Sequence, residues 1–231
     1  MDNKEIKSYT HVALVLDASG SMGGFEDKTI STMKEFFRSL KSDEDKTVID
    51  LWQFDDEVCH LIDGVDLSEA EGNAIEGYKT GGCTALYDAI CIGIDDLGKK
   101  FAAMKEEDRP DMIVFAILTD GFENASQKFK LQDVKDRIQH QSEKYSWSFR
   151  FLAANQDAVL TGHEMGLEAK SCMTFDASPE GIKTGAAGLS AYCCGEVREM
   201  SRMRRAERMK GKAPSKAKTP AKAKGKGKKK A

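Results

Sequence analysis

The strongest constraint on the fold is an uninterrupted apolar run, MIVFAIL, at residues 112–118. Its side chains do not alternate between apolar and polar, so a strand formed there must be covered on both faces. A second β-rich run, HVALVLD, spans residues 11–17 and leads directly into the small polar segment ASGS. Strands buried on both faces are typical of a parallel sheet that lies between two layers of helices.

The rest of the sequence alternates short strands with amphipathic helices, whose apolar residues recur at intervals of three and four. The expected order after the first strand is helix 30–40, strands 47–54 and 57–62, helices 68–76 and 86–104, strand 112–118, helix 131–138, strand 147–153, helix 157–165, strand 171–175 and a helix from Ser178. This order predicts an α/β fold with a doubly wound, mostly parallel central sheet and helices on both faces. The tight turn between the two strands of residues 47–62 predicts one antiparallel edge strand.

Charge divides the chain into two parts. Residues 202–231 contain 14 Lys and Arg against one acid, whereas the other residues contain 21 bases and 37 acids. We therefore expect one acidic domain at residues 1–200 and a basic, Lys/Ala-rich disordered tail at residues 201–231. The basic side chains of such a tail favour binding to nucleic acid, to an acidic protein surface or to the chain's own acidic domain. A solubilising or targeting role is a further alternative.

The sequence also indicates a cellular location. It contains no run of about 18 apolar residues, so we expect no transmembrane helix and no membrane partner. The first ten residues lack the apolar core of a secretion signal. The six cysteines form no C-x-x-C pair, so we expect reduced thiols, mostly buried, and a cytoplasmic protein.

Three polar loops lie where ligands bind in such sheets, outside the carboxyl ends of the strands. The first offers Asp17, Ser19 and Ser21, the second Thr84, and the third Asp120. All five are oxygen ligands, which suit Mg²⁺, Mn²⁺ or Ca²⁺ and disfavour zinc and copper. With only two carboxylates the site is about neutral, so a bound ion keeps an exchangeable position whose natural occupant is a carboxylate from another molecule.

Together these loops resemble the metal-ion-dependent adhesion site of von Willebrand factor type A domains. The similar segments are DASGS at residues 17–21, GGCT at 81–84 and LTDG at 118–121, and the resemblance covers residues 8–195. It implies a Rossmann-like fold and a domain that binds proteins by holding an acidic side chain of the partner through the metal. Stand-alone domains of this type occur in bacteria and their phages, and we expect an intracellular protein of that kind.

The resemblance also implies a role for each residue. Ser19 and Ser21 ligate the metal directly, and Asp17 does so directly or through water. Thr84 and Asp120 exchange between direct and water-mediated contact. Many relatives have G-G-T where this chain has Cys83 before the threonine, so Thr80 is an alternative ligand to Thr84; the ALYDA segment that follows favours Thr84.

Other functions find less support in the sequence. There is no G-x-x-x-x-G-K-[ST] phosphate loop and no G-x-S-x-G frame around Ser19, and Ser19 also stands where an aspartyl phosphatase needs a second acid. We therefore expect a non-enzymatic, metal-dependent protein-binding module without catalytic residues. The alternative is a nucleic-acid-associated protein that binds through its tail while the domain recruits a second factor. Polar residues after strands also form turns and helix caps. We expect Glu123 and Asn124 to be solvated or capping groups and not ligands.

Overall fold

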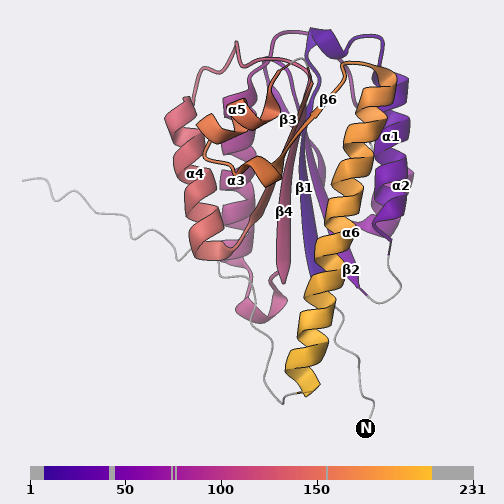
Figure 1. Cartoon of the computed structure of the whole chain (residues 1–231), viewed down its shortest axis with the longest axis vertical. Helices are drawn as coiled ribbons and strands as arrows, with labels where there is room; N and C mark the ends of the chain where they lie inside the picture. Colours follow the sequence, from indigo (N-terminus) through magenta and orange to yellow (C-terminus); the bar gives the residue numbers. More distant parts are fainter. Residues whose placement is uncertain (1–7, 42–44, 74, 76, 155, 210–231) are drawn as a thin grey trace, which may run out of the picture.

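A six-stranded sheet forms the middle layer of the structure (Figure 1). The computed structural model describes residues 8–41, 45–73, 75, 77–154 and 156–209. The strand order is β3-β2-β1-β4-β5-β6. The strands are β1 (Tyr9–Asp17), β2 (Lys46–Phe54), β3 (Val58–Asp66), β4 (Met112–Thr119), β5 (Ser148–Ala154) and β6 (Cys172–Phe175).

The pairing of the strands confirms the predicted sheet. β1 pairs in parallel with β2 on one side and with β4 on the other, and β4, β5 and β6 continue the parallel order. β3 returns antiparallel to β2 and forms the predicted edge. All eight residues of β4 are buried, as the uninterrupted apolar run requires of a central strand.

Helices cover both faces, and each expected helix is present. One face carries α1 (Glu26–Ser39), α2 (Leu67–Asn73) and α6 (Pro179–Met209); the other carries α3 (Leu86–Ala103), α4 (Leu131–Tyr145) and α5 (Ala158–Glu164). Short 3₁₀ turns occur at Gly20–Met22, Glu106–Asp108 and Ala169–Ser171. The helices serve as crossover connections, which parallel strands need because a tight turn cannot join two parallel strands.

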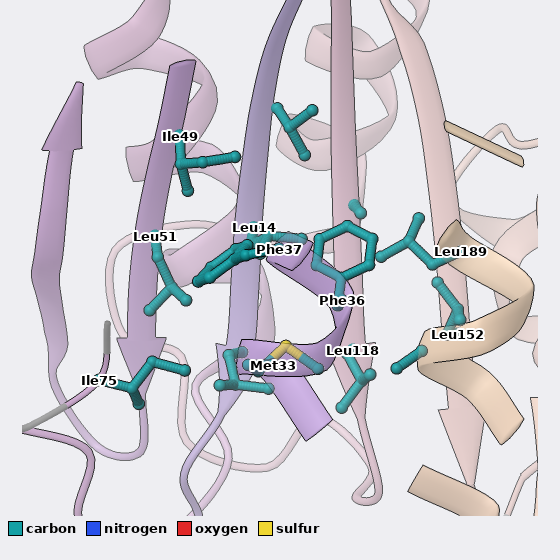
Figure 2. Packing of buried hydrophobic residues seen from close by; sticks show 14 of the residues in the cluster. Leu14, Met33, Phe36, Phe37, Ile49, Leu51, Ile75, Leu118, Leu152 and Leu189 are labelled. Carbon is teal, nitrogen blue, oxygen red and sulfur yellow. The ribbon is translucent and has the colours of Figure 1, made fainter. Parts of the chain in front are cut away.

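Each face of the sheet has its own apolar core. Figure 2 shows the layer beneath α1 and α6, where strand residues meet helix residues: Leu14, Ile49, Leu51, Leu118 and Leu152 with Met33, Phe36, Phe37 and Leu189. The second core lies beneath α3 and α4 and contains Trp52, Phe101, Phe115 and Phe151. Both cores hold the carboxyl ends of β1 and β4 at fixed positions.

Helix α6 extends beyond the predicted domain boundary. Ser178 caps its first turn, because the Gly181 amide donates to Ser178 Oγ at 3.0 Å. The helix continues through Met209, past residue 200, because the segment SRMRRAERM contains no glycine or proline and is rich in helix formers. Residues 210–231 of the predicted tail lie outside the described residues. None of the described helices combines the length and apolar composition needed to cross a membrane.

The cysteines differ in part from the expectation of buried thiols. All six are free, but only Cys91 and Cys193 are buried, whereas Cys59 and Cys83 are exposed. Cys83 lies in the glycine loop between α2 and α3.

A buried charge cluster joins the antiparallel edge to α3. The fully buried carboxylate of Asp50 accepts from His11 Nε2 at 2.6 Å and from His60 Nε2 at 2.7 Å. Lys100 Nζ donates to both Asp50 oxygens, at 3.0 and 3.1 Å, and to Asp63 at 2.7 Å. Burial alone would raise the pKa of Asp50, but these donors and the Lys100 charge outweigh it and hold that pKa below its usual range.

We predict that Asp50→Asn lowers the free energy of unfolding by about 3 kcal/mol, because a neutral amide leaves buried donors without their acceptor. Urea unfolding of the full chain at pH 7 measures the change. The matched control is Asp63→Asn, whose side chain is 72% exposed and which should cost less than about 1 kcal/mol. Equal losses in the two variants would contradict this account.

The same variant predicts a pH dependence. An Asp whose pKa is lowered by folding stabilises the fold above its unfolded pKa of about 3.9, and this stabilisation is lost as the pH falls further. The difference in unfolding free energy between wild type and Asp50→Asn should therefore narrow as the pH falls below about 4. A difference that widened below about pH 4 would have the wrong sign.

Candidate metal centre

The three predicted loops meet at one edge of the sheet. The chain leaves β1 toward β2 on one side and later builds β4 on the other, so the carboxyl ends of β1 and β4 flank a topological switch point. The first loop begins at Asp17, the third follows Thr119, and the glycine loop before α3 contacts the first through Gly81 N to Ala18 O at 2.8 Å. These loops lie at the upper end of the sheet in Figure 1.

Asp17 is the most deeply buried of the predicted ligands, with 0% of its surface exposed. Its Oδ1 accepts from the Ser19 amide at 2.8 Å, and its Oδ2 accepts from Thr119 Oγ1 at 2.5 Å. Tyr78 Oη donates to the Asp17 carbonyl at 2.6 Å. The carboxylate is thus oriented by groups from β4 and from its own loop, whereas Tyr78 holds the backbone of Asp17.

The two serines connect the first loop to the third. Ser19 Oγ lies 3.1 Å from Ser21 Oγ, which donates to Asp120 Oδ1 at 2.5 Å. Ser19 and Asp120 are buried, whereas Ser21 is exposed. The cluster is therefore open to solvent on the side of Ser21.

The geometry also distinguishes between the two candidate threonines. A Cβ placed on Gly121 would lie 2.9 Å from Thr84 Oγ1 and 3.8 Å from Asp17 Oδ2, so Thr84 belongs to the same cluster and Gly121 must lack a side chain. Thr80 Oγ1 instead donates to the Glu26 carboxylate on α1. The structure thus places Thr84, and not Thr80, beside Asp17.

Neighbouring acidic and amide side chains hold the loops in place. Asn124 Oδ1 accepts from the Thr84 amide at 2.8 Å, and Glu123 accepts from the amides of Tyr87, Ala125 and Ser126. These are the capping roles that the sequence predicts for both residues. Asp88 does more than favour the start of α3: its carboxylate accepts from three successive amides of the loop before α4, those of Gln127, Lys128 and Phe129.

Sequence reasoning missed three supporting residues. Thr119 directly follows the apolar run at residues 112–118, so the sequence indicates only the last residue of a strand. Tyr78 lies in a segment without a recognisable motif. Gln156 Nε2 donates to the Gly121 carbonyl at 2.8 Å, across two loops. Of these three residues, only Thr119 could have been found from the sequence, because its hydroxyl lies next to the predicted ligand Asp120.

The electrostatics of the cluster favour a cation. Burial raises the pKa of Asp17, hydrogen bonds from Ser19 and Thr119 oppose this shift, and the Asp120 charge adds to it. Burial likewise raises the pKa of Asp120, against the hydrogen bond from Ser21. Among the described residues, the groups that hydrogen-bond the Asp17 carboxylate are neutral. The two ionised carboxylates therefore lie in an environment where positive charge is stabilising.

The donor set fits a hard divalent cation. Two carboxylates and three hydroxyls converge from three loops, and oxygen donors of this kind suit Mg²⁺, Mn²⁺ or Ca²⁺. The residues that could hold the ion are those predicted from the sequence: Asp17, Ser19, Ser21, Thr84 and Asp120.

A second group of potential ligands lies away from this edge. Ligand atoms of Asp50, His60 and Asp63 lie within 4.8 Å of one another. However, Lys100 Nζ is 2.7–3.1 Å from both carboxylates, so the chain supplies the cation there itself. The cluster is an internal ion pair and not the metal centre that the sequence predicts.

Comparison with known protein families and structures identifies the fold. The family model of the von Willebrand factor type A domain matches residues 11–179. A search of curated protein sequences finds no match to this chain.

Solved structures share the fold at low sequence identity. Proximal thread matrix protein 1 from the mussel byssus is 14% identical, with a TM-score of 0.58 over 81% of this chain and 47% of its own. This chain thus spans about half the length of that protein. A second structure of the mussel protein, 15% identical with a TM-score of 0.57 over 81% of this chain and 46% of its own, is described with a zinc-occupied metal-ion-dependent adhesion site. The von Willebrand domain of the type V pili tip protein Mfa5 from Porphyromonas gingivalis is 10% identical, with a TM-score of 0.56 over 83% of this chain and 97% of its own.

We predict that Mg²⁺ raises the melting temperature of the full chain by about 5–10 °C relative to EDTA, because an ion bound only by the folded state stabilises it. In Asp120→Asn the side-chain oxygen still accepts the hydrogen bond from Ser21, but one negative charge is lost. The difference in melting temperature between Mg²⁺ and EDTA should therefore vanish in this variant. In EDTA the variant should be at least as stable as wild type, because the charge repulsion with Asp17 is relieved.

Differential scanning fluorimetry measures these shifts. The matched control is Asp56→Asn, an exposed carboxylate near the same edge, which should retain the full Mg²⁺ shift. A shift that survives in Asp120→Asn would contradict the assignment of this residue to the centre.

Proposed function

This chain belongs to the von Willebrand factor type A family, and we propose that it binds a partner protein through a divalent cation held at the candidate metal centre. Residues 1–200 form the binding module, and residues 201–231 form a basic extension. The partner supplies a carboxylate. Mg²⁺ is the ion that best fits the donor set, with Mn²⁺ and Ca²⁺ as substitutes.

One observation supports this function above the others. The buried carboxylate of Asp17 has neutral hydrogen-bonding partners and a neighbouring negative charge, that of Asp120. The buried carboxylate of Asp50 in the same domain is neutralised by Lys100. Burying charge without compensation is costly, so the arrangement at Asp17 favours a site completed by an ion from solution.

Each residue of the centre has a role that follows from its position. Thr119 orients the Asp17 carboxylate toward the loops, and Asn124 fixes the backbone of Thr84. A bound cation would supply an open coordination position for a carboxylate oxygen. Exposed Ser21 marks the side from which the partner approaches. The protein breaks no bond in the partner, so these residues bind and position without catalysing a reaction.

The proposed location is the cytoplasm. The six free cysteines fit a reducing compartment, and exposed Cys83 lies directly beside Thr84, where oxidation would disturb the loop.

Affinity capture tests the proposed function. We expect the immobilised full chain to retain a partner from the native lysate in Mg²⁺ and to lose it in EDTA. Asp120→Asn should retain nothing in either buffer, and Asp63→Asn, an exposed carboxylate in the Lys100 cluster, should behave as wild type. The same set of retained proteins in both buffers would contradict the metal bridge.

A second candidate function is supported by the charge of residues 202–231, where 14 Lys and Arg accompany one acid. We propose that this segment binds nucleic acid through its phosphates while the domain recruits another factor. Lysine contacts to phosphates release counterions, so such binding depends on salt and not on base sequence.

The two functions respond to different reagents. If the tail contacts about six phosphates, its affinity for a duplex DNA should fall by about a thousandfold between 50 and 200 mM salt and be unaffected by EDTA. Fluorescence anisotropy of labelled DNA measures this, and deletion of residues 202–231 should abolish binding. DNA binding that persists after the deletion would rule out the tail as its cause.

A further inference from the structure

Large exposed apolar side chains gather at the edge that carries the metal centre. Phe122 is 61% exposed, Val159 is 42% exposed and Leu160 is 62% exposed. Isolated exposed apolar residues are normal on protein surfaces, but a group at one site marks an interaction surface. The fourth such residue among those the structure describes, Met203, lies far along α6.

Hydrogen bonds connect this apolar group to the metal loop. Phe122 is two residues after Asp120, and the Gly121 carbonyl between them accepts from Gln156 Nε2 at 2.8 Å. Thr161 Oγ1 in turn donates to Gln156 Oε1 at 3.0 Å. Val159 and Leu160 lie on the same first turn of α5, near the upper end of the sheet in Figure 1. The loop of Phe122 and the start of α5 are therefore held together.

The Asp157 carboxylate fixes that first turn. Its Oδ1 accepts from the amides of Val159 and Leu160, at 3.0 and 3.1 Å. The apolar side chains are thus presented from an anchored backbone, which lowers the entropy lost when a partner covers them.

The opposite flank of the centre is acidic. Asp56 and Glu57 are exposed on the turn between β2 and β3. This turn contacts the glycine loop, because the Ala85 amide donates to the Asp55 carbonyl at 2.9 Å and the Asp56 carboxylate raises the pKa of the Cys83 thiol. The acidic side chains of this flank offer an acidic partner segment no apolar contact, whereas exposed Phe122 and Leu160 on the other flank favour contact with an apolar side chain of the partner.

We infer that the partner presents an acidic residue with a bulky apolar residue a short distance away in the same segment. The inference rests on the proposed function, because the acidic residue is the one that the metal binds. Phe122 is two residues after Asp120 along the chain, so the Cα atoms of these residues lie at most about 7 Å apart. An extended chain covers this distance within about three residues.

A library of short random peptides displayed on phage tests the inference against the immobilised full chain. In Mg²⁺ we expect enrichment of sequences with Asp or Glu and an apolar Leu, Ile, Met, Phe or Trp within about three residues. The most enriched peptide is then synthesised, and its affinity for the variants is measured by fluorescence anisotropy.

The double variant Phe122→Ser, Leu160→Ser should bind this peptide at least about tenfold more weakly while still requiring Mg²⁺. Met203→Ser is the matched control and should bind as wild type. Phe122, Leu160 and Met203 are all exposed. Melting temperatures of the double variant and of the control equal to that of wild type verify that the fold is intact.

The outcomes separate the inference from the function on which it rests. Mg²⁺-dependent enrichment of acidic residues without apolar neighbours, or full affinity of the double variant, overturns the inference and leaves the metal bridge standing. Enrichment that is identical in EDTA, or no enrichment, overturns both.

Discussion

The parallel pairing of β1 with β4 is the interaction on which the site depends. It aligns Leu16 with Leu118, so both strands end at the same level and their loops face each other. Ser21 and Asp120, 99 residues apart in sequence, therefore share a hydrogen bond. The two apolar cores hold this pairing from both faces, and loops on such a scaffold are free to vary without loss of the edge that carries them.

Two buried carboxylates in this domain show two ways to offset the cost of burying charge. Asp50 accepts from two histidines and from Lys100, so the chain provides its own cation. Asp17 lies beside a second acid and is hydrogen-bonded by neutral groups. The first arrangement stabilises the fold by itself, whereas we propose that the second is completed by an ion. This contrast, and not the number of acidic residues, distinguishes the candidate functional site from a structural one.

Most of the fold could be predicted from the sequence because its signals are local: apolar runs, helical spacing and turn residues. The five proposed donor residues follow from short motifs at strand ends. The Asp50 cluster and the Gln156 bridge could not be predicted, because they depend on contacts between segments distant in sequence. The sequence already favoured Thr84 over Thr80 through the ALYDA segment, and the hydrogen bond of Thr80 to Glu26 supports the same preference. Helix α6 continues through Met209, into the predicted basic tail, because these basic residues also favour helix.

The most direct test of the central claim is the anomalous scattering of Mn²⁺ in a crystal of the full chain. The account predicts one strong peak among the oxygens of Ser19, Ser21 and Asp120, at ligand distances of about 2.0–2.3 Å. A peak beside Asp50, His60 and Asp63, or no peak at the carboxyl edge of β1 and β4, would contradict it.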